Sequence, residues 1–234
     1  MTPEDFRAQL EHELDWRQKE LRVYANQLSS IHEEDKRIYC KALIVMLYSH
    51  FEGFSRMAFL TYLKLINDEK IARSLAKENI TASSLLDVFH DLQYPDKSNE
   101  KCCCELFKSP SMETKFSKFF IYTHFIRKLD EIFEKEVYIS EDMSDRIVDA
   151  ESNLTPRVIR KILYRLGLPY DAFDQYEGII CRLLIRRNNY AHGDNAEGIN
   201  EVDYHNLERD VNIMISDLMV LLTEAARTKS YLRV

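Results

Sequence analysis

The stretch Glu34–Asn67 reads EDKRIYCKALIVMLYSHFEGFSRMAFLTYLKLIN, and the architecture of the chain follows from it. Its apolar side chains recur at the 3.6-residue period of an α-helix, namely Ile38, Leu43, Ile44, Leu47, Phe51, Phe54, Phe59, Leu63 and Ile66. No proline interrupts the stretch, and Gly53 is its one weak helix former. At 1.5 Å per residue the pattern predicts a single helix roughly 50 Å long.

The same period and the usual end signals predict further helices on both sides. Thr155 and Pro156 form a helix start, because threonine caps a helix and proline suits its first turn. Gly167 suits the end of that helix, since glycine adopts the left-handed conformation that often follows a last turn. The predicted helices cover about residues 3–29, 156–167, 171–192 and 200–229.

The scarcity of turn residues supports a helical protein. The 234 residues include only 5 glycines and 5 prolines, fewer than the average use of about 7% and 5% predicts. We therefore expect an all-α fold, a bundle of four to five main, mostly long antiparallel helices with a helical insertion. We expect a single domain over residues 1–234, with a core of 1–67 and 153–234 and an insertion of about 68–152.

Composition indicates the cellular compartment of the protein and the kinds of partner that it can bind. No apolar run approaches the ~20 residues of a membrane span, and the N-terminal stretch lacks the apolar core of a secretory signal. With five cysteines in no disulfide-like spacing, we expect a cytoplasmic protein without membrane contact. The net charge of -7 counts against a long nucleic-acid groove. Residues 155–192 nevertheless carry seven basic and three acidic side chains, which fits a small phosphate pocket.

The run RRNNYAHG, Arg186–Gly193, carries the chemistry. Arginine offers a planar fork of donors for a phosphate, and a histidine with an ordinary pKa near 6.5 suits acid–base work at neutral pH. Asn188 and His192 are four residues apart and share a helix face, whereas Arg187 lies about 100° round from Asn188. The competing interpretation is structural, because arginine and histidine near a helix C-terminus also cap its last carbonyl groups.

Three stretches together resemble the HEPN superfamily (higher eukaryotes and prokaryotes nucleotide-binding), in the prokaryotic branch found in defence and toxin–antitoxin operons. RRNNYAHG resembles its Arg-x4-His signature. LYSHFEGFSRMAFLTYL, Leu47–Leu63, resembles an early helix of that branch with an aromatic-Glu-Gly-aromatic core. NLTPRVIRKILYRLGLP, Asn153–Pro169, resembles the segment before the signature helix.

The resemblance implies a helical bundle that forms a homodimer with two signatures facing each other, and a metal-independent endoribonuclease in which the 2′-hydroxyl attacks the adjacent phosphate. Carried over by position, the catalytic residues would be His192 as acid and base, Arg187 as phosphate ligand, Asn188 as orienting group and Glu52 as a group completing the site. Arg186 would add to phosphate binding with Arg187. Glu52 is equally open to a second interpretation, as a structural carboxylate paired with an arginine.

The sequence implies no cofactor and no metal. Cys102, Cys103 and Cys104 lack the spacing of a zinc site, and the scattered histidines form no HExxH pattern. The aromatic residues Phe116, Phe119, Phe120, Tyr122 and Phe125 predict a core face, with a base-stacking platform as the lesser alternative. Some HEPN toxins have a tyrosine two residues after the histidine, the target of a partner nucleotidyltransferase. Asp194 stands there in this chain, which argues against that form of regulation.

We therefore expect an endoribonuclease acting on RNA in antiphage defence or a toxin–antitoxin pair, with an antitoxin or defence protein as a further partner. Two alternatives stay open. One is a non-catalytic HEPN module that binds RNA, a nucleotide or a protein. The other is an interaction protein in which Arg187 and His192 only hold a dimer together.

Overall fold

The computed structural model of the protein describes residues 1–94, 117–193 and 197–233. Over these residues the fold is all-α, which confirms the predicted fold class. The α-helices are α1 (Pro3–Asn26), α2 (Glu33–Asp68), α3 (Glu78–Ser84), α4 (Leu86–Gln93), α6 (Ser117–Arg127), α7 (Leu129–Glu134), α8 (Glu141–Ile147), α9 (Pro156–Arg165), α10 (Glu177–Ala191) and α11 (Glu201–Arg227). None of the helices described is both long and apolar enough to cross a membrane.

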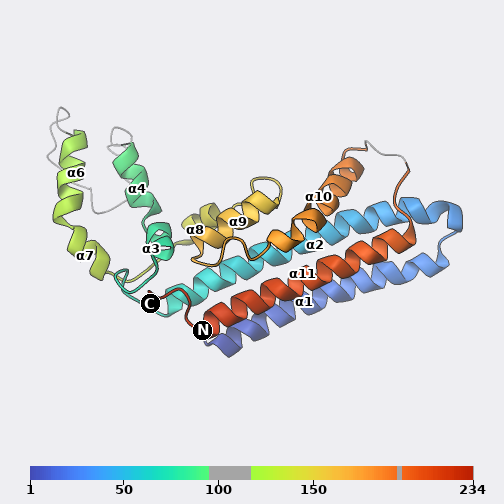
Figure 1. Cartoon of the computed structure of the whole chain (residues 1–234), viewed down its shortest axis with the longest axis horizontal. Helices are drawn as coiled ribbons and strands as arrows, with labels where there is room; N and C mark the ends of the chain where they lie inside the picture. Colours follow the sequence, from blue (N-terminus) through green and yellow to red (C-terminus); the bar gives the residue numbers. More distant parts are fainter. Residues whose placement is uncertain (95–116, 194–196, 234) are drawn as a thin grey trace.

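Three long helices, α1, α2 and α11, lie side by side and form the base of the molecule (Figure 1). Helices α2 and α11 run parallel, because Lys36 pairs with Glu201 at 2.9 Å at their N-terminal ends and Glu69 pairs with Lys229 at 2.5 Å at their C-terminal ends. Helix α1 runs antiparallel to both (Figure 1). A parallel pair requires a long connection, and the chain from residue 69 to residue 200 supplies it.

The helix ends follow the sequence signals closely. The Thr2 hydroxyl oxygen accepts a hydrogen bond from the Asp5 backbone N–H at 3.0 Å, and the Thr2 backbone N–H donates one to the Asp5 carboxylate. This reciprocal capping satisfies two N–H groups that a helix start leaves unpaired. Thr155 caps α9 in a similar way, accepting from the Val158 N–H at 3.2 Å. Gly167 follows α9 with a φ of 68°, the left-handed conformation predicted for it.

The helix that carries Arg186–His192 begins later than the sequence predicts. We expected it from Asp171, but α10 starts at Glu177, after a 3-10 turn over Asp174–Tyr176. The reason is packing, because Phe173 and Tyr176 are both buried and their ring centroids lie 5.5 Å apart. The chain therefore turns in order to bury two aromatic rings before it enters the helix.

Helix α2 lies at the centre of the core. It is 36 residues long and contacts α1, α10 and α11. Most of its predicted apolar stripe is buried, including Leu43, Phe51 and Phe59. Ile38 is the exception and is 61% exposed.

The helices between α2 and α9 fall into two groups, one packed in the main core and one packed in a separate small cluster. Side chains of α3 and α8, such as Ile80 and Ile147, belong to the main core. Helices α4, α6 and α7 project from one end of the bundle (Figure 1) and share a separate cluster of Leu85, Val88, Ile121 and Ile132. The division into a core of 1–67 and 153–234 with an insertion of 68–152 stays a prediction.

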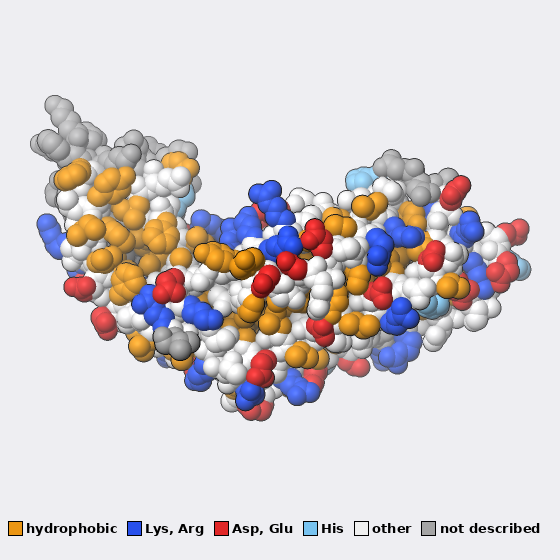
Figure 2. All heavy atoms as spheres, in the orientation of Figure 1, with side chains coloured by type: hydrophobic (Ala, Val, Ile, Leu, Met, Phe, Trp, Pro, Cys, Tyr) orange, Lys and Arg blue, Asp and Glu red, His pale blue; other side chains and the backbone are white. Residues whose placement is uncertain are grey.

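The aromatic residues of this projecting part only partly follow the prediction of a core face. Phe125 packs against the small cluster, but Phe119 is 71% exposed and Tyr122 is also exposed. Phe116 and the side chain of Phe120 lie outside the described residues. Apolar side chains are visible over α4, α6 and α7 in Figure 2. The helices are short, and they offer too little opposing surface to cover every ring.

Candidate functional site

Arg187 lies on the inward face of α10. Ile180 and Leu183 of this helix are buried, and positions three and four residues apart share one helix face. Arg187 continues that face one turn further on, and it is half-buried instead of solvent-facing. The position on the helix thus directs a charged side chain toward α2 and the segment that leads into α9.

The guanidinium of Arg187 is held by three residues. Its carbon Cζ lies 4.3 Å from the ring centroid of Tyr48, in a cation–π contact. Its Nη1 donates to Asn153 Oδ1 at 3.0 Å and to Asn188 Oδ1 at 2.7 Å. Within the described residues no hydrogen bond reaches Nε or Nη2, so one edge of the fork stays open to a ligand.

Tyr48 anchors this arrangement on α2. Its side chain is 1% exposed, and its hydroxyl accepts a hydrogen bond from the Leu154 backbone N–H at 2.9 Å. Burial raises the pKa of Tyr48, and a hydrogen bond to the Glu52 carboxylate raises it further. The phenol therefore stays neutral at physiological pH and keeps its proton.

Glu52 lies one turn after Tyr48 on α2 and is directed to the tyrosine, not to the motif. No ion pair joins Glu52 to Arg187 or to His192, among the pairs formed by described residues. The Oε2 atom of Glu52 is buried and has no hydrogen-bond partner among the described residues. Neither interpretation of Glu52 made from the sequence describes this contact, since both paired it with an arginine or a histidine.

His192 lies apart from this cluster within one chain. It is the C-cap residue of α10, and its backbone N–H donates to the Asn188 carbonyl at 3.0 Å. Its side chain is exposed and makes no hydrogen bond with any described residue. The side chain of Asn188, expected to share the face of His192, turns instead to Arg187.

Arg186 faces another part of the molecule. Together with Arg182 it lines a pocket of about 240 Å³ between α10 and α11, which Asp203 and Asp210 also line. Arg182 lies 3.6 Å from Asp210. The two neighbouring arginines of the motif therefore do not meet at one place in the monomer, and the acids of α11 offset the charge on the Arg186 side.

Much of the basic stretch before the motif is engaged in internal pairs. Arg160 pairs with Asp174 at 2.7 Å and with Glu177 at 3.0 Å, and Lys161 pairs with Glu151. Figure 2 shows positive and negative side chains intermixed along this face of the molecule. The excess of basic residues counted in the sequence therefore does not form one free positive surface.

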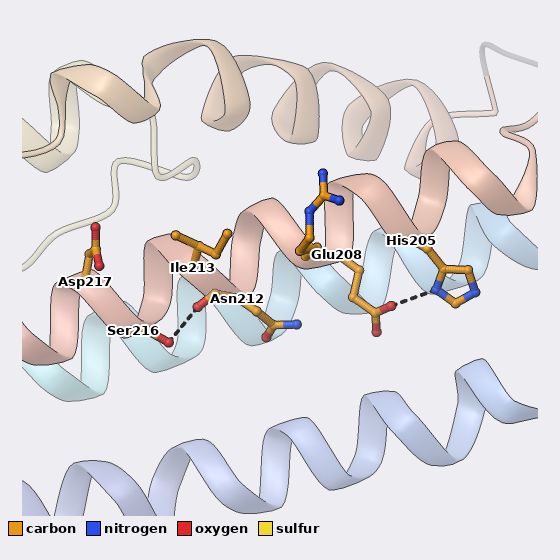
Figure 3. A pocket seen from close by; sticks show the side chains of 7 residues that line it. His205, Glu208, Asn212, Ile213, Ser216 and Asp217 are labelled. Carbon is orange, nitrogen blue, oxygen red and sulfur yellow. Dashed lines mark hydrogen bonds and ion pairs between the residues drawn. The ribbon is translucent and has the colours of Figure 1, made fainter.

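An open pocket of about 450 Å³ along α11 is lined by His205, Glu208, Asn212 and their neighbours (Figure 3). His205 is paired with Glu208 at 3.0 Å there, and none of the predicted site residues reaches it. No group of metal-binding side chains occurs in the parts of the chain that are described. Cys102, Cys103, Cys104 and Asp194 lie outside those parts.

Tyr48 and Asn153 are the site residues that the sequence did not indicate. Both belong to the stretches Leu47–Leu63 and Asn153–Pro169, whose resemblance was recognised as a whole. The signal that could have found Tyr48 is its spacing, one helical turn before Glu52. Asn153 gave no such signal, because only the folded chain brings it beside α10.

Comparison with known families identifies the family of the chain. A family model described as RiboL-PSP-HEPN matches residues 12–223. No curated protein and no solved structure matches the chain. The matched range covers most of the chain and contains α2, α10 and the segment before α9, which meet at Arg187. The predicted superfamily is confirmed, and the protein belongs to the RiboL-PSP-HEPN family of HEPN proteins.

Proposed function

We propose that the protein is a metal-independent endoribonuclease that acts as a homodimer, in antiphage defence or as the toxin of a toxin–antitoxin pair. One observation carries the proposal. Arg187 is held through Nη1 while Nε and Nη2 carry no hydrogen bond among described residues, and its helix ends at the exposed His192. Family membership supports an RNA-directed or nucleotide-directed function.

The proposed RNA cleavage would use an arginine and a histidine in different roles. The 2′-oxygen forms a bond to phosphorus as the bond from phosphorus to the 5′-oxygen breaks. One group takes the proton of the 2′-hydroxyl, and another gives a proton to the departing 5′-oxygen. Arg187 would stabilise the negative charge that accumulates on the phosphate oxygens. The products are a 2′,3′-cyclic phosphate and a 5′-hydroxyl, and no metal is required.

A dimer accounts for the separation of the two residues in one chain. A general base and a general acid must act at the same phosphate. The base must be unprotonated and the acid protonated, so a single imidazole cannot fill both roles at the same time. Two copies of His192 at an interface would supply both roles. Asn188 would act by holding Arg187, to which it is hydrogen-bonded, and Arg186 would extend the phosphate contact across the dimer.

The test is cleavage of single-stranded RNA in excess EDTA, with analysis of the product ends. We expect cyclic-phosphate ends from the wild type and no cleavage by Arg187→Ala or His192→Ala. Matched controls are His12→Ala and Arg227→Ala, which remove an exposed histidine of α1 and an exposed arginine of α11. Equal cleavage by the wild type and His192→Ala would refute the proposal.

The second candidate is a non-catalytic HEPN module that binds RNA or another protein. One observation favours it, namely that the His192 side chain makes no hydrogen bond with the side chains of Arg187 or Asn188 in the described chain. In that case RNA would bind to the wild type and Arg187→Ala would bind it more weakly, while no RNA would be cut under any condition.

A further inference from the structure

Three segments far apart in sequence meet at the guanidinium of Arg187, which suggests that its orientation is set before any ligand arrives. Tyr48 comes from α2, Asn153 from the segment before α9, and Arg187 from α10. We propose that Asn153 and Tyr48 are positioning residues, which hold Arg187 so that Nε and Nη2 present their N–H groups to an RNA phosphate. This inference rests on the proposed function for its substrate, but its structural part can be tested without RNA.

The ring of Tyr48 sets the plane of the guanidinium. At 4.3 Å from the ring centroid, Cζ lies within the range of a cation–π contact. The ring itself cannot turn away, because it is buried in the main core. Contact with a fixed aromatic face restricts the tilt of the guanidinium but leaves it free to rotate in its own plane.

Asn153 removes that remaining freedom. Its Oδ1 accepts from Nη1 at 3.0 Å, while its own backbone is held on both sides. The Asn153 N–H donates to the Ala150 carbonyl at 2.8 Å, and the Thr155 N–H donates to the Asn153 carbonyl at 2.8 Å. A rigid acceptor and a rigid ring together define one orientation of the fork.

The unbonded donors are the consequence of this geometry. Both hydrogen bonds of the guanidinium are made by Nη1, to Asn153 and to Asn188, so Nε and Nη2 keep N–H groups that no described residue accepts. A phosphate prefers two parallel N–H donors from one arginine, and Nε with Nη2 forms such a pair. Donors that are oriented in advance stabilise a transition state without reorganisation during the reaction. Loss of Asn153 should therefore slow the chemical step more than it weakens binding.

A merely structural role for Asn153 and Tyr48 predicts something else. In that case substitutions would lower stability and reduce the amount of folded protein, with kcat per folded molecule unchanged. Two conservative changes separate the roles. Tyr48→Phe keeps the ring under Arg187 and removes the hydroxyl, whereas Tyr48→Leu removes the ring. Asn153→Asp keeps an acceptor oxygen at the same place, whereas Asn153→Ala removes it.

The first experiment needs no activity. Nitrogen-15 NMR of arginine side chains measures how fast a guanidinium rotates, and the Arg187 signal is identified by its loss in Arg187→Lys. We expect slow rotation in the wild type, in Asn153→Asp and in Tyr48→Phe. We expect rotation about 10-fold faster in Asn153→Ala and in Tyr48→Leu, on the order expected when a charge-assisted hydrogen bond is lost. Equal rates in the wild type and Asn153→Ala would overturn the inference.

The second experiment measures kcat and KM on RNA. We expect Asn153→Ala to lower kcat by about 10-fold to 100-fold, because small displacements of a catalytic group have effects of that size, with KM within about 2-fold. Tyr48→Phe should keep kcat within about 3-fold of the wild type. If the wild type cuts RNA and Asn153→Ala cuts it equally fast, positioning fails while the proposed function stands. If the wild type cuts no RNA, the proposed function fails and the NMR rates alone decide the positioning role.

Discussion

Gly198 lies against the backbone of Arg37, so close that a Cβ at residue 198 would stand 2.3 Å from the Arg37 carbonyl oxygen. The glycine has a φ of 70°, which other residues rarely adopt. This contact seats the connection between α10 and α11 on the first turns of α2. The end of α10, where His192 lies, is therefore tied to the core a few residues downstream.

Gly198→Ala is expected to destabilise the fold by at least about 2 kcal/mol, because a left-handed alanine is strained and its Cβ would collide with the backbone of Arg37. Gly178→Ala is the matched control. It lies in the first turn of α10 with nothing within 4 Å of an added Cβ, and it should stabilise the helix by about 0.5–1 kcal/mol. Urea unfolding measures both. Equal midpoints for the two variants would contradict the assigned contact.

Stability should fall below neutral pH through His50. Burial lowers its pKa from the ordinary 6.5, against an opposing effect of Glu20, which lies 3.1 Å away. A histidine with a lowered folded pKa binds its proton more readily when unfolded. Stability is therefore lost as pH falls through 6.5 toward the folded pKa. We expect the urea midpoint of His50→Gln to change less between pH 7.5 and pH 5.5 than the midpoint of the wild type. The exposed His12→Gln should show the same change of midpoint with pH as the wild type.

Arg187→Ala and His192→Ala should abolish RNA cleavage alike but differ in stability. Arg187 is half-buried and contacts Tyr48 and Asn153, so its loss should cost about 1–2 kcal/mol. The side chain of His192 is exposed, and its loss should change stability by less than about 0.5 kcal/mol. Thermal or urea unfolding checks the difference. Comparable destabilisation by both variants would mean that His192 is packed and not exposed.

A dimer whose site needs both copies of His192 predicts that one altered chain inactivates the pair. Light scattering should give about twice the 27.7 kDa mass of one chain. A mixed dimer of one wild-type and one His192→Ala chain keeps both arginines but has a single imidazole at the interface. We expect no RNA cleavage by this purified mixed dimer, whereas a mixed dimer of wild-type and His12→Ala chains should cleave like the wild type. Cleavage by the first mixed dimer at half the wild-type rate or more would show that one His192 is sufficient.

The helices could be predicted because their signals are local. The 3.6-residue period of α2 and the cap Thr155 depend on neighbouring residues, and α2 and α11 begin and end within two residues of their predicted limits. Ile38 belongs to the predicted apolar stripe of α2, yet it is 61% exposed. The period alone does not say which positions near a helix end are covered by neighbouring elements, so this exposure could not be predicted.

The candidate site was only half predictable for a similar reason. Arg187 and His192 stand in one short run, and their residue types indicate phosphate binding and proton transfer. Tyr48 and Asn153 are 139 and 34 residues away from Arg187 along the chain. Their contacts with it depend on how α2, α9 and α10 pack. The sequence placed Asn188 on the helix face of His192, and the hydrogen bond that Asn188 accepts from Arg187 could not be predicted from that spacing.

The parallel arrangement of α2 and α11 has a consequence for folding during synthesis on the ribosome. Helices α1 and α2 are neighbours in sequence and can pair as soon as both have emerged. Helix α11 must return across the whole intervening chain to cover α2, and such distant contacts form late. Until about residue 227 is translated, an apolar face of α2 remains bare. We therefore expect the nascent chain to expose this apolar face until α11 has packed against α2.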